Sequence, residues 1–444
     1  MTLGKYRFDK GPSLLTMPQL IDELSVLAES NLSFKYTKLD TITHYFFEDG
    51  TRLEAKSDVK EFARELKLKL NEDEEHVLAH LKTSAFYYDT TADIFLKRSL
   101  HVLKNFFDLK TLKGILHSPR LNLFKNMHAQ NAKRFKNKKT VQLFDRYATY
   151  NGSNPYKAPA LLNIIPHLEF GFGAFIPKKG MHQISEHLVA LALELGVSFK
   201  FDSPVEKIDL EGKKIKGLWS RAVFYPANYI VSDADMHVVY NKLLGPEFRP
   251  QKLLAQEKSS SAYVFFLGIK KEFKELGLHN ILFSENYQEE FRCLFETDEP
   301  YSDPTIYINI TSKYCPDDAP KNSENWFVMV NVPHNKSGEK IRYADTLRKQ
   351  VFAKINRVLN TNIEDFIEEE AILDPYGIEL QTSSVGGSLY GNSSNNKYAA
   401  FLRHANFNSR IKGLYFVGGS VHPGGGIPLC LMGANIVSNM ISKN

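Results

Sequence analysis

Cysteine is scarce in this sequence, whose 444 residues include only Cys293, Cys315 and Cys430. These three lie far apart without a paired spacing, which argues against a disulfide framework or a zinc site and fits a reducing compartment. Long apolar runs are also lacking, since no stretch reaches the roughly 18 consecutive apolar residues that a membrane-spanning helix needs. The start, MTLGKYRFDKGP, contains no apolar run of a secretory signal. We therefore expect a cytoplasmic protein, or one that lies peripherally on the cytoplasmic membrane.

Several catalytic motifs are missing as well. The sequence has no G-x-S-x-G, no P-loop and no C-x-x-C, so hydrolase, nucleotidase and thiol-redox functions have no support. The net charge of +5 is too mild to indicate a nucleic-acid partner. His76 and His80 are spaced i, i+4 but have no third ligand nearby, so we expect surface histidines and no metal site.

Aromatic residues are plentiful, with 31 Phe and 21 Tyr. They suit a protein that handles a large apolar ligand, and a large aromatic core is the alternative interpretation. A chain of 444 residues exceeds one ordinary hydrophobic core, so we expect two or three packed units.

Hydrophobic periodicity outlines these units. Alternating residues around Asp49-Gly50 predict a hairpin. The stretch from Lys60 to about Lys139 is helical in pattern: apolar residues recur at i, i+4, i+8 in Phe62, Leu66 and Leu70, and again in Leu96, Leu100, Leu103 and Phe107.

The second half of the chain mixes strands and helices. A helix is predicted from Met181 to Leu195, followed by a meander with turns at Glu211-Gly212 and near Pro226. Residues 260–335 are strand-rich, and a helix is predicted near 343–359. The last stretch returns to a strand, a glycine turn and a helix.

A basic segment occupies the helical region. Between Lys97 and Lys139 there are twelve Lys or Arg residues and one acid, Asp108, interleaved with apolar residues such as Phe107. An interfacial helix on anionic lipid needs such a basic face with apolar anchors. A core-facing stripe with a solvated Lys face is the alternative.

The most informative segment is the C-terminal run GLYFVGGSVHPGGGIP, residues 413–428. It predicts a buried strand that ends in glycines and leads into a helix. Glycines let backbone amides approach a ligand closely, and the helix directs its positive N-terminus to the same place. A polyphosphate, a ribityl chain or an electron-rich ring edge would each be bound well there.

Four segments together resemble one enzyme family. YRFDKGPSLLTMP near the start, Pro177 to Ile184, ANYIVSDAD and GLYFVGGSVHPGGGIP occur in the order found in bacterial phytoene-desaturase-type carotenoid desaturases, which depend on FAD. The segment from Arg146 to Glu169 is most similar to the hydroxycarotenoid 3,4-desaturase branch. The resemblance spans nearly the whole chain.

The resemblance implies roles at matching positions. Phe8, Asp9, Gly11 and Pro12 would pass beside the flavin, and Val205 would meet the adenine through its backbone. An ordinary buried strand residue is the alternative for Val205, and a turn or cap residue for Asp9. Arg146 and Tyr147, with Tyr150 and Tyr156, would contact a substrate end group, or would stack structurally. The flavin's ribityl chain and ring edges would be lined by Gly418, Gly419, Ser420, Gly424, Gly425, Gly426, Ile427 and Pro428.

Two departures from the family pattern stand out. The family has a βαβ unit with G-x-G-x-x-G ahead of the FDxGP segment, and this sequence starts only a few residues before that segment. We therefore expect this polypeptide to bind FAD poorly without such a unit. The usual P-x-G-G-M also reads Pro177-Lys178-Lys179-Gly180-Met181, in which lysine replaces one glycine.

The resemblance implies an α/β fold with a discontinuous, incomplete Rossmann-like FAD-binding domain (1–56, 165–240 and 405–444). A helical membrane-associating subdomain (57–164) and an α+β substrate domain (241–404) would complete it. The implied activity is an FAD-dependent oxidoreductase that removes hydrogens from an apolar carotenoid at the membrane, with quinone or oxygen as electron acceptor. A flavin-dependent carotenoid isomerase, an amine-oxidase-like enzyme and a non-catalytic prenyl-lipid-binding protein remain as alternatives.

Overall fold

A seven-stranded sheet dominates the computed structural model, which describes residues 1–107, 121–122, 125–396 and 403–443. The strand order is β16-β12-β15-β14-β13-β5-β6, and all neighbours are antiparallel except β13 and β5, which are parallel. The strands are β5 (Thr41–Phe46), β6 (Arg52–Lys56), β12 (Ser261–Ile269), β13 (His279–Leu282), β14 (Ile306–Ile310), β15 (Glu324–Val332) and β16 (Ile367–Leu373).

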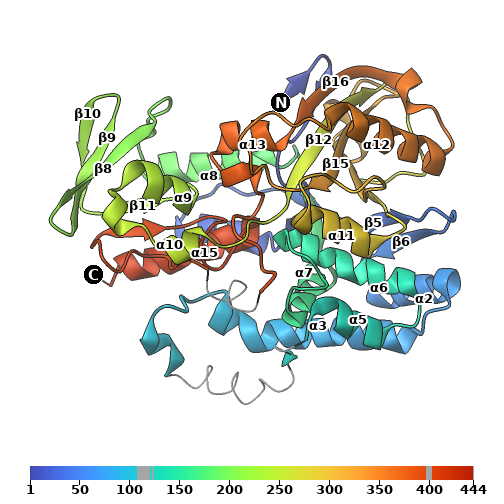
Figure 1. The fold of residues 1–444 in the computed structure, drawn as a ribbon, viewed down its shortest axis with the longest axis horizontal. Coiled ribbons are helices and arrows are strands. Elements are labelled where there is room, and N and C mark those ends of the chain that lie inside the picture. The colour runs from blue at the N-terminus through green and yellow to red at the C-terminus, as the bar shows by residue number, and fades with distance from the viewer. Residues whose placement is uncertain (108–120, 123–124, 397–402, 444) are drawn as a thin grey trace.

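The strand β12, next to the edge strand β16, is buried along its whole length because both faces of the sheet are covered. Side chains alternate between the faces of a strand, so Phe265 and Leu267 pack against α12 (Ala344–Leu359), whereas Val264 and Phe266 face the opposite side. The helix α11 (Tyr287–Glu296) lies near the end of the sheet, as Figure 1 shows. The opposite face of the sheet is the one that forms part of the cavity described below.

The structure corrects one predicted boundary. The hairpin around Asp49-Gly50 is confirmed as β5 and β6, but it extends the large sheet through β13. Residues 41–56 therefore belong with the strands of 241–404 and not with the predicted 1–56 part of a cofactor domain. A parallel pairing between strands more than 200 residues apart leaves no local signal in the sequence.

A helical layer lies beside this sheet (Figure 1). Phe62, Leu66 and Leu70 of α2 are buried, as their spacing predicts. The helix predicted through Leu96, Leu100, Leu103 and Phe107 is wrong, because α3 ends at Phe95 and only a 3-10 turn, η1 (Leu103–Phe106), follows. The layer contains α2 (Val59–Leu70), α3 (Glu74–Phe95), α5 (Met127–Arg134), α6 (Lys138–Asp145) and α7 (Ile165–Phe170), with the 3-10 turns η3 (Arg146–Asn151) and η4 (Ala160–Ile164).

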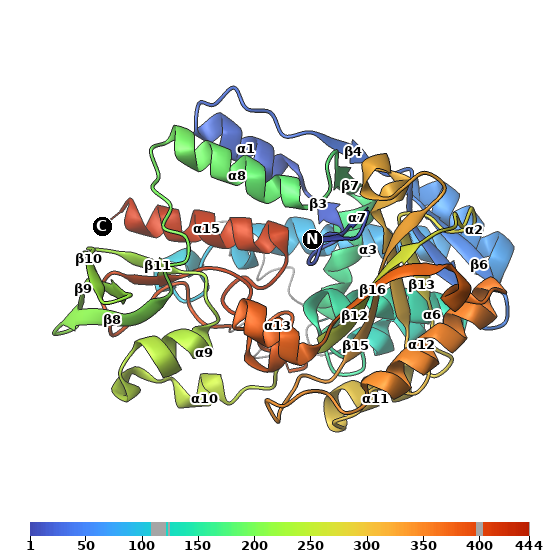
Figure 2. The same cartoon turned by 90° about the horizontal axis from the view of Figure 1, so that it is seen from above.

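Beside the large sheet and the helical layer, the fold has a third region. It contains three helices that lie side by side, α1 (Gln19–Leu27), α8 (His182–Glu194) and α15 (Ile427–Ile441), as Figure 2 shows. Ile21, Ile184 and Leu431 pack together between them. The three-stranded sheet of β3 (Leu15–Thr16), β7 (Ala174–Pro177) and β4 (Tyr36–Lys38) leads the chain into α1 and α8. These elements set the start of α15 beside the large sheet.

Smaller elements complete this region. The predicted hairpin at Glu211-Gly212 is confirmed, whereas the next turn lies at Arg221-Ala222, before the position predicted near Pro226. The remaining strands are β1 (Thr2–Leu3), β2 (Tyr6–Arg7), β8 (Val205–Glu211), β9 (Lys214–Ser220), β10 (Val223–Pro226), and the parallel pair β11 (Ile230–Ser232) and β17 (Leu414–Phe416). The remaining short helices include α9 (Met236–Val238), η5 (Val239–Leu243), α10 (Gln251–Leu254) and α13 (Pro375–Thr382).

Among the helices of the described residues, none combines the length and apolar character needed to cross a membrane.

Candidate functional site

A cavity of about 830 Å³ lies where the helical layer, the large sheet and the chain ends meet. Most of its lining is apolar. The sheet contributes Val264 and Ile281, and the end of α3 contributes Phe95. The volume and the apolar walls are those of a small-molecule site that withholds a ligand from water.

Segments from both ends of the chain form part of this wall. Lys10 to Leu14 and Gly425 to Leu429 both line the cavity. The two segments are more than 400 residues apart in the sequence, and the packing of α15 against α8 and α1 brings them together. The predicted meeting of the two ends at one cavity is therefore present in the fold.

Two glycines of these segments leave room for a bound group. A Cβ built on Gly11 or on Gly426 would meet no atom within 4 Å, so no protein neighbour fills the space beside them. Gly426 has a φ of +105°, which side chains rarely adopt, and it begins α15. The first amides of a helix lack partners within the helix and favour a negatively polarised ligand atom. A flat ring with an electron-rich edge fits this cradle.

The other predicted glycine-run residues lie just behind the wall and do not line the cavity as the described residues form it. The Ser420 hydroxyl accepts a hydrogen bond from the Met236 amide at 3.2 Å. A Cβ placed on Gly425 would lie 2.8 Å from Cδ1 of Tyr390, whereas its distance to the Gly419 Cα, 3.6 Å, is an ordinary contact. Gly418 and Gly424 turn the backbone with φ values of +90° and +137°. These residues shape the turn that presents Gly425 to Pro428, and their contact with a cofactor stays a prediction.

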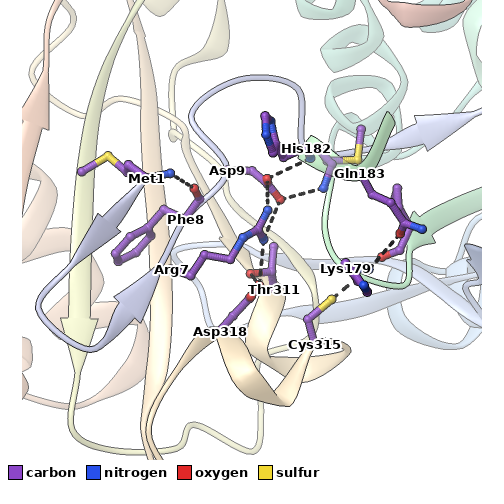
Figure 3. Close-up of polar contacts among 12 residues, drawn as sticks. Met1, Arg7, Phe8, Asp9, Lys179, His182, Gln183, Thr311, Cys315 and Asp318 are labelled. Carbon is purple, nitrogen blue, oxygen red and sulfur yellow. Dashed lines mark hydrogen bonds and ion pairs between the residues drawn. The ribbon is translucent and has the colours of Figure 1, made fainter. Parts of the chain in front are cut away.

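Asp9 has a structural contact of its own, shown in Figure 3. Its carboxylate accepts hydrogen bonds from the amides of Met181 (2.9 Å) and His182 (3.2 Å) at the start of α8. It also pairs with Arg7 at 2.6 Å, and Arg7 reaches Asp318 at 3.1 Å. The cap interpretation of Asp9 is therefore the one that the structure supports. The cluster joins β2, α8 and the large sheet next to the cavity-lining segment.

Gly180 makes this joint possible. A Cβ at this position would lie 2.2 Å from Arg7 Nη1 and 2.7 Å from Asp9 Oδ2, and the φ of Gly180 is +80°. The lysine that replaces a family glycine at Lys179 is solvent-exposed, so this departure leaves the joint intact. Phe8, in the same segment, packs its ring against Phe266 at 5.5 Å and does not line the cavity as the described residues form it.

Arg146 lines the cavity within a closed network of hydrogen bonds. Its guanidinium donates to the Tyr45 hydroxyl at 2.9 Å, pairs with Glu169 at 3.4 Å and lies over the Tyr147 ring at 4.2 Å. Tyr147 and Tyr150 both donate to the Glu169 carboxylate. Burial, together with the nearby Glu169 charge, raises the pKa of both tyrosines well above the ordinary value. The network keeps both phenols protonated, so neither is suited to act as a base.

The predicted aromatic cluster is thus only partly at the cavity. Arg146 and Tyr150 line it, and Tyr147 lies behind them. Tyr156 instead packs against His128 and Phe291. Glu169, which organises the cluster, was not identified from the sequence; its one signal is an isolated acid in the apolar helix IPHLEF.

Two further polar groups of the cavity carry no sequence motif. Glu290 accepts hydrogen bonds from the Ser284 hydroxyl (2.6 Å) and the Thr305 amide (2.8 Å), and burial raises its pKa. His279 lies on β13 beside Tyr307 and Ser13. Isolated polar residues on buried strands cannot be assigned to a site before the strand order is known.

Two expectations about burial are wrong. Val205 begins β8 but is 39% exposed, so the alternative of a buried strand residue is wrong, and its backbone contact with the adenine stays a prediction. His80 is buried and packs against Phe144 at 4.4 Å and Phe135 at 5.0 Å, not at the surface. The acidic residues around it on α3 misled the surface assignment.

Comparison with known proteins assigns a family to this architecture. The family model "Flavin containing amine oxidoreductase" matches residues 3–439. The chain is 47% identical over 440 residues to the 1-hydroxycarotenoid 3,4-desaturase of Flavobacterium sp. (strain P99-3), covering 99% of this chain and 90% of the relative. It is 30% identical over 453 residues to the 4,4'-diapolycopene oxygenase of Methylomonas sp., covering 99% and 90%.

Solved structures share the fold at low sequence identity. A putrescine oxidase variant superposes with a TM-score of 0.61 at 10% identity, covering 99% of this chain and 91% of that one. The likeness supports the predicted α/β fold.

Proposed function

We propose, because the chain belongs to the family of flavin-containing amine oxidoreductases, that it is a flavin-dependent carotenoid desaturase of the hydroxycarotenoid 3,4-desaturase type. One observation carries the proposal. The relative of that name aligns along almost the whole chain at 47% identity, and the aligned residues enclose a mostly apolar cavity of about 830 Å³ that a polyene can enter.

The chain's own residues fit a flavin ring at one end of this cavity. Gly11, Pro12 and Gly425 to Pro428 would hold it, with the start of α15 at its electron-rich edge. Acceptance of a hydride from a saturated carbon is the chemistry that a flavin supplies when bound. The apolar walls orient the polyene and exclude water. Glu290, the cavity carboxyl, is held by hydrogen bonds from Ser284 and Thr305.

The name of the relative describes a substrate with a hydroxyl on carbon 1 and a reaction between carbons 3 and 4. We carry this substrate class to the present chain. A single carbon then separates the hydroxyl-bearing carbon from the reacting bond, so the two must bind close together.

The function is tested by co-expressing the chain, extended by a βαβ unit with G-x-G-x-x-G so that it can hold FAD firmly, with enzymes that supply either a hydroxylated or an unsubstituted acyclic carotenoid. We expect a product with one more conjugated double bond, seen as a red-shifted absorption spectrum and a mass lower by two hydrogens. Pigment profiles that stay unchanged with both substrates would contradict the proposal. Running the assay with and without air distinguishes oxygen from a quinone as the acceptor that reoxidises the flavin.

We propose further that firm FAD binding requires a βαβ unit with G-x-G-x-x-G in addition to these residues. The support is an apolar surface at the C-terminal ends of α1 and α8 and along the segment that follows α8. Leu27 is 79% exposed, Leu195 63% and Phe201 76%. Parallel strands such as β11 and β17 are normally part of a sheet covered on both faces. A unit of about 30 or more residues would cover such a surface.

A chain extended ahead of Met1 by such a βαβ unit should purify yellow and retain more flavin than the chain of 444 residues. An extended chain that purifies colourless while the shorter one is yellow would overturn this part of the proposal.

We also propose that the protein lies peripherally on a membrane. The stretch from Asp108 to Arg120, with Leu112, Ile115 and Leu116 of the basic segment, falls outside the described residues. Phe107 belongs to the described part of the basic segment and is 86% exposed. Leu96 and Leu100, which precede Phe107 in the chain, line the cavity. A lipid-dissolved substrate would then enter beside the anchoring segment.

The membrane proposal is tested by sedimentation of the protein with anionic vesicles. Phe107→Ser should weaken binding to the vesicles, whereas Leu68→Ser, at an exposed position of α2, should not. Equal binding by both variants would contradict the proposal.

A further inference from the structure

A chain of polar side chains crosses the apolar cavity wall beside the N-terminal segment. The Ser13 and Tyr307 hydroxyls lie 2.6 Å apart, and the Tyr307 hydroxyl lies 2.7 Å from His279 Nδ1. All three residues line the cavity. Ser13 directly follows Gly11 and Pro12, so this polar chain reaches the segment that we expect to hold the flavin.

Asn309 fixes the position of the histidine proton. Its side-chain nitrogen donates to the Leu278 carbonyl at 3.0 Å and lies 3.2 Å from His279 Nδ1. Because the same amide nitrogen serves both contacts, Nδ1 of His279 must accept. A neutral imidazole with an accepting Nδ1 carries its proton on Nε2.

The Nε2 donor of His279 is left without a protein acceptor. His279 is only 3% exposed, and its Nε2 has no hydrogen-bond partner within the part of the chain that the structure describes. Buried donors are nearly always paired, and an unpaired one is costly unless a ligand supplies the acceptor. The residue lines the cavity, so a ligand in the cavity is the available source.

The acceptor is expected to be neutral. Burial, followed by the charges of Arg146 and His44, lowers the pKa of His279 to about 3, so the ring is uncharged at ordinary pH. Arg146, the nearest cation that lines the cavity, already pairs with Glu169. Burying a carboxylate beside an uncharged imidazole is costly, whereas a hydroxyl, ether or carbonyl oxygen needs no counter-charge.

We propose that His279 Nε2, backed by Tyr307 and Ser13, is the site that binds the hydroxyl oxygen of the substrate and selects hydroxylated polyenes. The inference rests on the proposed function for the identity of the substrate. The position of the histidine agrees with that chemistry, because two hydrogen bonds, through Tyr307, link His279 to Ser13, which follows Gly11 and Pro12. The bond to be oxidised is only one carbon beyond the carbon that carries the hydroxyl. An unsubstituted polyene would leave Nε2 unpaired and would bind less well.

The test compares dissociation constants of the full chain for a 1-hydroxylated acyclic carotenoid and its unsubstituted parent, measured by quenching of tryptophan fluorescence in detergent micelles. The wild type should prefer the hydroxylated compound. His279→Leu, which removes the donor at similar size, should lower this preference at least about tenfold. His279→Gln, whose amide nitrogen can take the place of Nε2, should retain most of it. His182→Leu, at an exposed position at the start of α8 and outside the cavity lining, should change nothing.

A wild-type preference that persists in His279→Leu overturns the inference, as does a wild type without preference. If His279→Leu does not fold, Tyr307→Phe takes its place: it removes the hydroxyl between His279 and Ser13 and should reduce the preference, and an unchanged preference overturns the inference. Binding is measured without turnover, so the outcome is independent of desaturase activity. A chain that binds hydroxylated polyenes selectively but never desaturates them would contradict the proposed function alone.

Discussion

Arg146 and Glu169 illustrate how one buried ion pair fixes a cavity wall. Both are almost fully buried, and Tyr147 and Tyr150 donate to the same carboxylate. Removing one member of a buried pair leaves the other charge uncompensated. We therefore expect Glu169→Gln to lower the free energy of unfolding by about 3 kcal/mol in urea titrations. Glu289→Gln, which breaks an exposed pair with Arg292, should leave it unchanged; equal effects would show that the network is not stabilising.

Gly11 offers a test of the cradle that does not disturb the fold. A Cβ there meets no atom within 4 Å, and the position has no left-handed φ. Gly11→Val should keep the wild-type melting temperature but project into the space beside the start of α15. We expect flavin affinity to fall at least about tenfold, or roughly 1.4 kcal/mol, in a fluorescence titration. Unchanged affinity in a folded variant would place the flavin elsewhere.

Sequence patterns identified some cavity residues and could not identify others. Gly425 to Pro428 were found because a glycine cluster between a predicted strand and helix is a local signal, whereas Gly11 and Pro12 were implied by the family resemblance. His279 and Tyr307 lie on largely buried strands, and Glu290 is one of several charged residues of α11; only the assembled sheet places all three at the cavity. Arg146 was predicted, but its partner Glu169 was not.

At the scale of elements, the junction between β2 and α8 depends on one glycine. Gly180→Ala adds a Cβ within 2.2 Å of Arg7 Nη1, which must leave Asp9 to make room. Gly212→Ala is a matched control because that glycine also has a positive φ, +62°, but no neighbour within 4 Å. Both substitutions should lower the free energy of unfolding by about 1 kcal/mol through backbone strain. Gly180→Ala should lower it by about 1–2 kcal/mol more, because it also disturbs the Arg7–Asp9 pair, as thermal or urea unfolding would measure. Equal losses would mean that the Arg7–Asp9 pair adds little.

Elements with strong local patterns were predicted well. The helix at α8, the helix at α12 and the hairpins of β5–β6 and β8–β9 follow from periodicity and turn residues. The helix predicted through Leu96 to Phe107 was wrong: α3 ends at Phe95, and Leu96 and Leu100 line the cavity instead of continuing a helix face. The parallel pairing of β5 with β13 could not be predicted, since it depends on contacts between distant parts of the chain.

For the whole molecule, buried histidines predict a loss of stability in mild acid. Burial lowers the pKa of His80 and His279 to about 3 and of His404 and His422 to about 4. Below about pH 6.5 the unfolded chain therefore binds more protons than the folded one, so stability falls as the pH falls. Each such histidine should lower the free energy of unfolding by about 2 kcal/mol when the pH falls from 6.5 to 5.

His80→Leu isolates one of these contributions away from the cavity. The variant should lose about 2 kcal/mol less than the wild type when urea unfolding at pH 6.5 is compared with pH 5. An identical pH dependence of the two proteins would show that His80 titrates normally in the fold.

Because the Lys10–Leu14 and Gly425–Leu429 segments close the same cavity, the cavity cannot form until both segments have been synthesised. The N-terminal segment must therefore wait for residues more than 400 positions later in the chain before its side of the site is complete.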